Sequence, residues 1–177
     1  MVYHKILVIG NACSGKTTLS RLLSRQSQID VTYVDSIQFD KDLNVKPYKE
    51  TTEILNCIMA QNHQWIIDGF GPLDNLIERF NQADHIVMID LPVWRNYYWA
   101  IKRQFTNLIK IARSELPTGS NERSFHHTVK LFKSIHQIHN KMRPELLRIL
   151  NRDQYKNKTL IISTYKHYKS QFDTSKK

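Results

Sequence analysis

Short apolar runs alternate with longer mixed segments along most of the chain. Five runs, each rich in β-branched or aromatic residues, cover residues 4–9, 31–34, 65–67, 85–89 and 159–162. The segments between them are long enough for helices, and this alternation predicts an α/β domain of parallel strands joined by right-handed crossovers. Ligands of such sheets bind beyond the carboxyl ends of the strands. The residues directly after each run are therefore the first candidates for chemistry.

A helical pattern occupies residues 94–143. Apolar residues at spacings of three and four predict a first helix, whose stripe we interpret as packed in the core or under a lid: Trp94, Tyr98, Ile101, Phe105, Leu108 and Ala112. A break at 116–120 and a second helix follow, and Pro144 is expected to stop that second helix. No repeat or linker divides the chain, so we predict a single domain over 1–177 with a helical lid over 94–143.

The positive charge is concentrated near this lid. Residues 94–158 hold 14 Lys and Arg against 4 Asp and Glu, whereas residues 1–93 hold 8 against 11, within a net charge of +10. Such a concentration indicates a polyanionic partner, which the phosphates of a nucleotide or a nucleic acid would supply. A solvated basic surface without a partner is the alternative.

Length and composition narrow the class of protein further. With 177 residues and 41% apolar content, the chain can fill one compact core. No apolar run approaches the roughly 20 residues that cross a bilayer, so no membrane partner is expected. The first residues lead directly into a strand pattern without the features of a signal peptide, and we expect a cytoplasmic protein. Cys13 and Cys57 have no neighbours at metal or redox spacing.

Residues 10–17 carry the clearest motif. They read Gly-Asn-Ala-Cys-Ser-Gly-Lys-Thr, which fits the P-loop pattern G-x-x-x-x-G-K-[ST], between a predicted strand and a predicted helix. A loop that wraps a triphosphate turns its backbone N–H groups inward, which glycine allows at little cost. The helix that follows directs its positive end at the phosphates. The predicted nucleotide-binding residues are Gly10, Asn11, Ala12, Cys13, Ser14, Gly15, Lys16, Thr17 and Thr18.

Three side chains of this motif have separate predicted roles. Lys16 bridges the β- and γ-phosphates, Thr17 offers its hydroxyl to Mg²⁺, and Thr18 reaches the α-phosphate. Cys13 and Ser14 contribute backbone donors only. The motif therefore predicts ATP and Mg²⁺ as cofactors.

Three aspartates stand where strands should end. Asp68 closes an apolar run as a Walker-B aspartate does, and is our first choice for Mg²⁺, with a helix cap or loop residue as the alternative. Asp90 has the same form before a proline turn, so a metal role and a cap are equally open. Asp35 is the best candidate to hold the acceptor and polarise its hydroxyl or phosphate oxygen, with a structural role such as a helix cap as the alternative.

Phosphoryl transfer also needs cations around the transferred group. The basic helices are their natural source, and we choose Arg103 and Arg143. The second-choice candidates for this role are Lys102, Arg95 and Arg123. A plain surface charge is the alternative for each.

The motifs together resemble the adenylate-kinase-like P-loop kinases, and most of all the group named DNA topology modulation proteins. The likeness rests on the P-loop and on the segments 33–35, 65–69, 89–92 and 143–144. It implies a P-loop NTPase fold, a five-stranded parallel sheet in order 2-3-1-4-5 with a helical lid, and an adenine site near Ser163 and Tyr165. The chain departs from the adenylate kinases at Gly71-Pro72, where they have Pro-Arg, and it has Trp99 where the resemblance implies a lid arginine.

We therefore predict an ATP-dependent phosphotransferase that acts on a nucleotide, a nucleoside or another small molecule. Because the arginine that grips a monophosphate is missing, a nucleoside monophosphate acceptor is in question. Two alternatives stay open: a nucleic-acid-associated ATPase or regulator, motivated by the basic segment, and a nucleotide-binding module without transfer activity.

Overall fold

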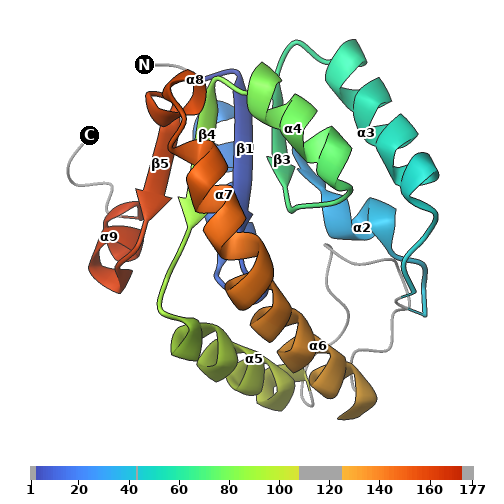
Figure 1. The fold of residues 1–177 in the computed structure, drawn as a ribbon, viewed down its shortest axis with the longest axis vertical. Helices are drawn as coiled ribbons and strands as arrows, with labels where there is room; N and C mark the ends of the chain where they lie inside the picture. The colour runs from blue at the N-terminus through green and yellow to red at the C-terminus, as the bar shows by residue number, and fades with distance from the viewer. Residues whose placement is uncertain (1–2, 43, 108–124, 173–177) are drawn as a thin grey trace.

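Five strands form one parallel sheet (Figure 1). The computed structural model of the chain describes residues 3–42, 44–107 and 125–172. The strands are β1 (Lys5–Gly10), β2 (Val31–Tyr33), β3 (Trp65–Asp68), β4 (His85–Ile89) and β5 (Thr159–Ile162), in the order β2-β3-β1-β4-β5. All pairs are parallel. The predicted fold class and strand order are confirmed, and each strand lies within one residue of its apolar run.

The strand register brings the ends of the central strands together. Val8 of β1 pairs with Asp68 of β3, and Gly10 pairs with Ile89 of β4. The residues that follow β1, β3 and β4 therefore meet at one edge of the sheet, as expected for a parallel sheet.

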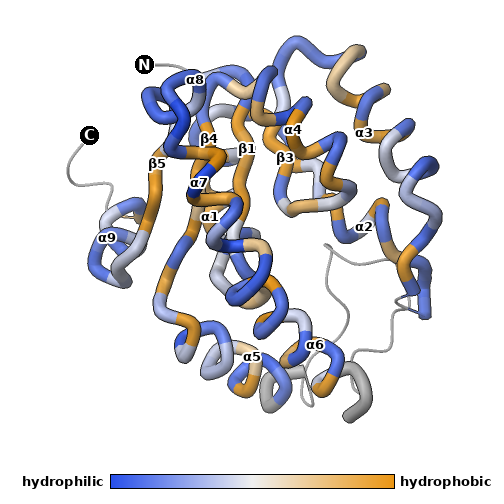
Figure 2. Tube along the Cα trace, in the orientation of Figure 1, coloured by the Kyte–Doolittle hydropathy of each residue, from blue (hydrophilic) through white to orange (hydrophobic). Residues whose placement is uncertain are grey.

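Helices cover both faces of this sheet. They are α1 (Lys16–Ser27), α2 (Val34–Gln38), α3 (Tyr48–Gln61), α4 (Leu73–Gln82), α5 (Val93–Asn107), α6 (Phe125–Gln137), the π-helical segment η1 (Ile138–Met142), α7 (Arg143–Leu150), α8 (Asp153–Lys156) and α9 (Tyr165–Ser170). On one face, Leu7 and Ile9 share a core with residues of α3, α4 and α7. On the other, Ile6 and Val8 pack toward α1. The apolar positions accordingly concentrate on the strands (Figure 2).

The helices of the predicted lid region lie beyond the carboxyl ends of the strands (Figure 1). α5 and α6 pack on each other through Tyr97 and Phe132, whose ring centroids are 5.4 Å apart in an edge-to-face arrangement. No described helix is long and apolar enough to span a bilayer.

The apolar stripe expected to be packed on α5 is in fact exposed, so that interpretation was wrong. Trp94 is 58% exposed, Tyr98 54% and Ile101 45%. Asn96 and Ala100 are buried instead. The reason is that aromatic residues lie on several sides of α5, so the helical spacing of apolar residues is compatible with more than one buried face. The rest of the stripe lies outside the residues whose side chains are described.

The second lid helix does not stop at Pro144, contrary to the prediction. The helical path continues from α6 through η1 into α7. Proline lacks the N–H that an α-helix needs, but the π-turn shifts the pairing, so that the N–H of Arg143 bonds to the carbonyl of Ile138. Pro144 then falls in the first turn of α7, where its missing donor costs little.

Candidate nucleotide-binding site

The P-loop has the backbone conformation that a phosphate cradle requires. Gly15, at the N-cap of α1, has φ 91°, and Cys13 has φ 55°. At Gly10 the backbone lies so close to β4 that an added Cβ would stand 2.5 Å from the carbonyl oxygen of Ile89. The loop closes on itself where the Ser14 N–H donates to the carbonyl of Asn11 at 3.2 Å. The motif thus folds as a tight turn at the end of β1.

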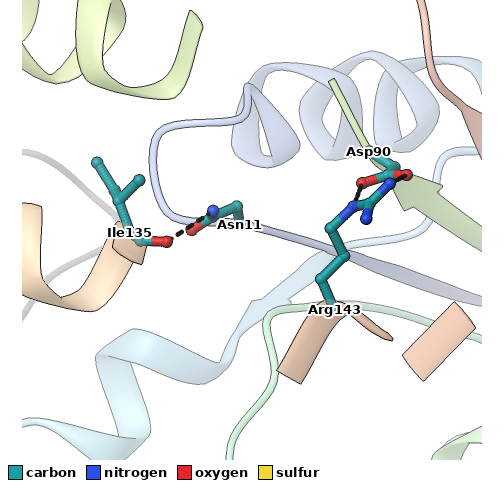
Figure 3. A network of polar contacts seen from close by, with 4 residues as sticks. All are labelled: Asn11, Asp90, Ile135 and Arg143. Atoms are coloured by element: carbon teal, nitrogen blue, oxygen red, sulfur yellow. Dashed lines mark hydrogen bonds and ion pairs between the residues drawn. The ribbon is translucent and has the colours of Figure 1, made fainter. Parts of the chain in front are cut away.

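Asn11 ties this loop to α6. Its Oδ1 accepts a hydrogen bond from the N–H of Ala12 at 2.7 Å, and its Nδ2 donates to the carbonyl of Ile135 at 3.0 Å (Figure 3). The sequence predicted nucleotide binding for Asn11 but held no signal for this second contact, because its partner is 124 residues away.

Lys16 begins α1 and turns its side chain back over the loop. Its Nζ donates to the carbonyl of Asn11 at 2.8 Å. The first N–H groups of a helix have no intrahelical acceptor and carry partial positive charge. One ammonium group and the N-terminus of α1 therefore converge on the turn, an arrangement suited to bind phosphate.

Asp68 is a buried acid at the same edge. Asp68 is only 4% exposed, and burial raises the pKa of its carboxyl group to about 6. The charge of Lys16 and hydrogen bonding by the hydroxyls of Thr17 and Ser20 lower that pKa, whereas the nearby Asp35 raises it. Within the described part of the chain, Asp68 Oδ2 has no hydrogen-bond partner.

These residues fit a magnesium ion. A buried carboxylate oxygen without a partner costs free energy unless a cation or donor satisfies it. Mg²⁺ prefers oxygen ligands and is usually held by one or two protein groups together with phosphates and water. No group of three His, Cys, Asp or Glu side chains in the described ranges could hold a metal alone. Thr17 and Asp68 are the residues that would hold the ion jointly with a nucleotide.

Asp90 and Arg143 form a bidentate ion pair at this edge (Figure 3). The Nε of Arg143 lies 2.5 Å from Asp90 Oδ1, and its Nη2 lies 2.9 Å from Oδ2. The hydrogen bonds to Asp90 raise the pKa of Arg143. A small cavity beside the pair is lined in part by Gly10, Phe70 and His139. The metal role of Asp90 stays a prediction, and in this structure its carboxylate binds Arg143.

Arg103 of α5 also reaches the P-loop. Its Nη1 donates to the Sγ of Cys13 at 3.6 Å. Lys102, one residue earlier, is exposed, and Arg123 lies outside the described residues. The structure therefore brings Arg103 to the loop and Arg143 to the neighbouring strand end, from two different helices.

The segment expected near adenine is aromatic. Ser163 is exposed between β5 and α9, and Tyr165 begins α9. The ring centroids of Trp99 and Tyr165 are 6.0 Å apart, and the Arg95 guanidinium lies 4.2 Å from the centroid of the Tyr165 ring. Trp99, which replaces the arginine expected by resemblance, thus packs against this segment.

Arg79 is a structural feature of the site that sequence reasoning missed. It is 0% exposed, and its guanidinium donates to the carbonyls of Gly69, at 2.9 Å, and Phe70. Burial lowers its pKa to about 9. The only signal was its position between Leu76 and Phe80 on the apolar face of α4. Arg79 holds the loop that follows Asp68.

Replacing Arg79 with methionine should lower the free energy of unfolding by about 3 kcal/mol. The substitution removes the arginine donor from the buried carbonyl of Gly69 and from the partly buried carbonyl of Phe70. A buried acceptor left unsatisfied costs about 1–3 kcal/mol. Urea unfolding followed by circular dichroism measures the effect. Arg148→Met is the matched control, because Arg148 lies on the surface, where its ion pair with Glu145 at 2.8 Å contributes little to stability. Equal losses in both variants would contradict the role of Arg79.

Fold and site together define the class: the chain has a P-loop NTPase fold, with a five-stranded parallel sheet in the order β2-β3-β1-β4-β5 and a phosphate-loop turn after β1. Among solved structures, shikimate kinase from Acinetobacter baumannii, in complex with shikimate, matches with TM-score 0.50 at 17% identity, covering 91% of this chain and 82% of that one. Shikimate kinase from Bacteroides thetaiotaomicron matches with TM-score 0.52 at 14% identity, covering 96% and 94%. At these identities the likeness shows the fold. No family model and no curated protein matches the sequence.

Proposed function

We propose that this protein is a cytoplasmic Mg-ATP-dependent phosphotransferase that acts on a small acceptor. The observation that carries the proposal is the convergence of Lys16, Thr17 and the buried Asp68 at one edge of the sheet. A triphosphate wrapped by residues 10–17 would place its terminal phosphates between the ammonium group and the carboxylate. The fold that this chain shares with the two shikimate kinases supports assignment as a phosphotransferase.

Different residues of the chain would bind the phosphates and the magnesium ion. Lys16 and the first N–H groups of α1 neutralise the β- and γ-phosphates. Bound between Thr17 and Asp68, magnesium would neutralise charge on the phosphate oxygens. Arg103 adds a positive charge from the lid side of the loop. Because transfer depends mostly on positioning and electrostatics, this arrangement can support it without a covalent intermediate.

The acceptor side is formed by different residues. Asp35 lies in α2 beside Gly69, the residue after Asp68, because a Cβ added at Gly69 would stand 3.9 Å from Asp35 Oδ1. The charge of Asp35 raises the pKa of Asp68, and Asp35 would polarise the acceptor hydroxyl. Arg143 is 38% exposed in its side chain and is oriented by Asp90, so it would face an anionic group of the acceptor or the transferred phosphoryl group. Phe70 and His139 line the cavity beside it. A small hydroxyl-bearing molecule suits this side of the site.

An acceptor panel tests the proposal. Purified protein with Mg-ATP is incubated with nucleosides, nucleoside monophosphates, sugars and shikimate, the last because one neighbouring structure binds it, and product formation is followed by ³¹P NMR. We expect transfer to at least one acceptor and faster ADP formation in its presence. ATP hydrolysis that no acceptor accelerates would contradict the proposal and favour a nucleotide-binding module or an ATPase.

A nucleic-acid-associated role is the second candidate, and one observation favours it. Trp94 and Tyr98 expose their rings one turn apart on α5, next to Arg95, and exposed aromatic side chains among cations can stack on unpaired bases. This role predicts binding of single-stranded DNA that weakens steeply with salt. Fluorescence anisotropy with a labelled oligonucleotide at two salt concentrations distinguishes it. Absence of binding at physiological salt would remove it.

A further inference from the structure

Tyr168 connects the last described helix, α9, to the P-loop. It is 7% exposed, and its hydroxyl donates to the carbonyl of Gly15 at 3.0 Å. A Cβ at Gly15 would stand 2.5 Å from Tyr168 Oη, so the phenol fills the space that a side chain at position 15 would need. Burial raises the pKa of Tyr168 to about 12, so the hydroxyl remains a donor at neutral pH. The nucleotide chemistry described above does not use this residue.

The contact bears on phosphate binding through the geometry of one peptide group. In a trans peptide the C=O of one residue and the N–H of the next point in opposite directions, and the described chain has no cis peptide bond. Tyr168 and the N–H of Leu19, at 3.1 Å, both hold the carbonyl of Gly15. They therefore also set the direction of the Lys16 N–H, one of the unpaired first-turn donors that a P-loop offers to phosphate.

Two further contacts place Tyr168 between the parts of the site. The Thr18 hydroxyl lowers the pKa of Tyr168 by hydrogen bonding, and Thr18 is the residue predicted to reach the α-phosphate. The Tyr168 ring also stacks on Tyr165, with ring centroids 6.2 Å apart, and its centroid lies 6.0 Å from that of Trp99. Tyr168 thus contacts both the phosphate loop and the aromatic segment expected near the base.

We propose that Tyr168 is a positioning residue for phosphate binding, which fixes the peptide group between Gly15 and Lys16 by its hydrogen bond. The inference rests on the proposed function, because it assumes that residues 10–17 bind polyphosphate. It assigns α9 a role that the sequence motif does not contain. The hydroxyl acts on the phosphates and not on the base, so its effect should be the same for ligands with and without a nucleoside.

Tyr168→Phe removes only the hydroxyl and tests the proposal. Calorimetry should give a dissociation constant for Mg-ATP about fivefold higher than in the wild type, the size of one hydrogen bond. Mg-tripolyphosphate, which has no base, should weaken by the same factor. Tyr155→Phe is the matched control: Tyr155 is also buried, its hydroxyl donates to Asn81 Oδ1 at 2.6 Å, and it lies in α8. It should lower the melting temperature without changing either dissociation constant.

The outcomes separate the inference from the proposed function. If the wild type binds neither ligand, the proposed function fails and this inference fails with it. If the wild type binds but Tyr168→Phe binds equally well, or weakens for Mg-ATP alone, only the inference is overturned. Equal weakening by Tyr155→Phe would show a general effect of destabilisation and overturn it too.

A measurement on the wild type covers the case in which Tyr168→Phe does not fold. Because coupling between two sites is reciprocal, tripolyphosphate bound at the P-loop should slow hydrogen exchange of the Tyr168 backbone amide, which bonds to the carbonyl of Thr164 at 2.9 Å. The amide of Asn151, at the end of α7, is the internal reference. Unchanged exchange at Tyr168 in the saturated protein would overturn the inference.

Discussion

Lys16→Met is expected to reduce Mg-ATP-dependent phosphoryl transfer at least a hundredfold while the protein stays folded. Lys16 Nζ lies 2.8 Å from the Asn11 carbonyl, inside the turn that would surround the β- and γ-phosphates. In the free protein the ammonium group makes one hydrogen bond to the loop, whereas during transfer it would face the charge that develops on the phosphoryl oxygens. Removing one preorganised electrostatic group of this kind typically costs a factor of 10² to 10³.

Lys158→Met is the matched control for this prediction. Lys158 also donates to backbone carbonyls, of Ala83 at 2.8 Å and of Asn81 at 3.1 Å, but it lies at the other end of the sheet, near the start of β5. Transfer to the best acceptor of the panel is measured for both variants, with circular dichroism as the test of folding. Similar activity in Lys16→Met and the wild type would remove the assignment of residues 10–17 as the phosphate site.

Asp68→Asn is expected to have opposite effects on activity and on stability. Transfer should fall by a factor on the order of 10² or more, because the neutral amide is a poor ligand for Mg²⁺ and cannot balance its charge. Stability in the absence of ligand should rise at neutral pH, because the ionised carboxylate is buried and one of its oxygens has no partner among the described residues. A destabilising group of this kind at a functional residue is a common cost of activity.

The pH dependence of this gain follows from the pKa. The pKa of Asp68 is about 6 in the folded chain against 3.8 for the unperturbed group, so the native state holds its proton more tightly. The stability that this proton contributes is fully present below about pH 4 and is lost as the pH rises through about 6. Above pH 6 the ionised group costs on the order of 2–3 kcal/mol, because each tenfold difference in proton affinity between the folded and unfolded chain is worth about 1.4 kcal/mol.

Urea unfolding at several pH values measures the difference between Asp68→Asn and the wild type. It should be near zero at pH 4 and reach its full value by pH 8, with the variant the more stable protein. Asp74→Asn is the control, because Asp74 is exposed on α4, and its difference from the wild type should not follow this curve. A variant less stable than the wild type at pH 8 would contradict the assigned environment of Asp68.

The sequence by itself determined the sheet and the phosphate loop. Both depend on features that are local in the chain: β-rich apolar runs separated by helix-length segments, and an octapeptide whose glycines allow one particular turn. The strand order came from the family resemblance and is confirmed. The alignment of Asp68 with β1 then follows from parallel pairing, because Val8 and Asp68 share a register position.

Only the tertiary structure decided which side chains complete the site. Asp90 binds Arg143 across 53 residues, and Tyr168 reaches Gly15 across 153. Neither pair has a spacing that a motif could contain, because each depends on how a helix packs against the sheet edge. The same limit explains α5, whose aromatic residues lie on several sides, so that contact with the rest of the fold, and not the helical period, determines that Ala100 is buried and Trp94 exposed.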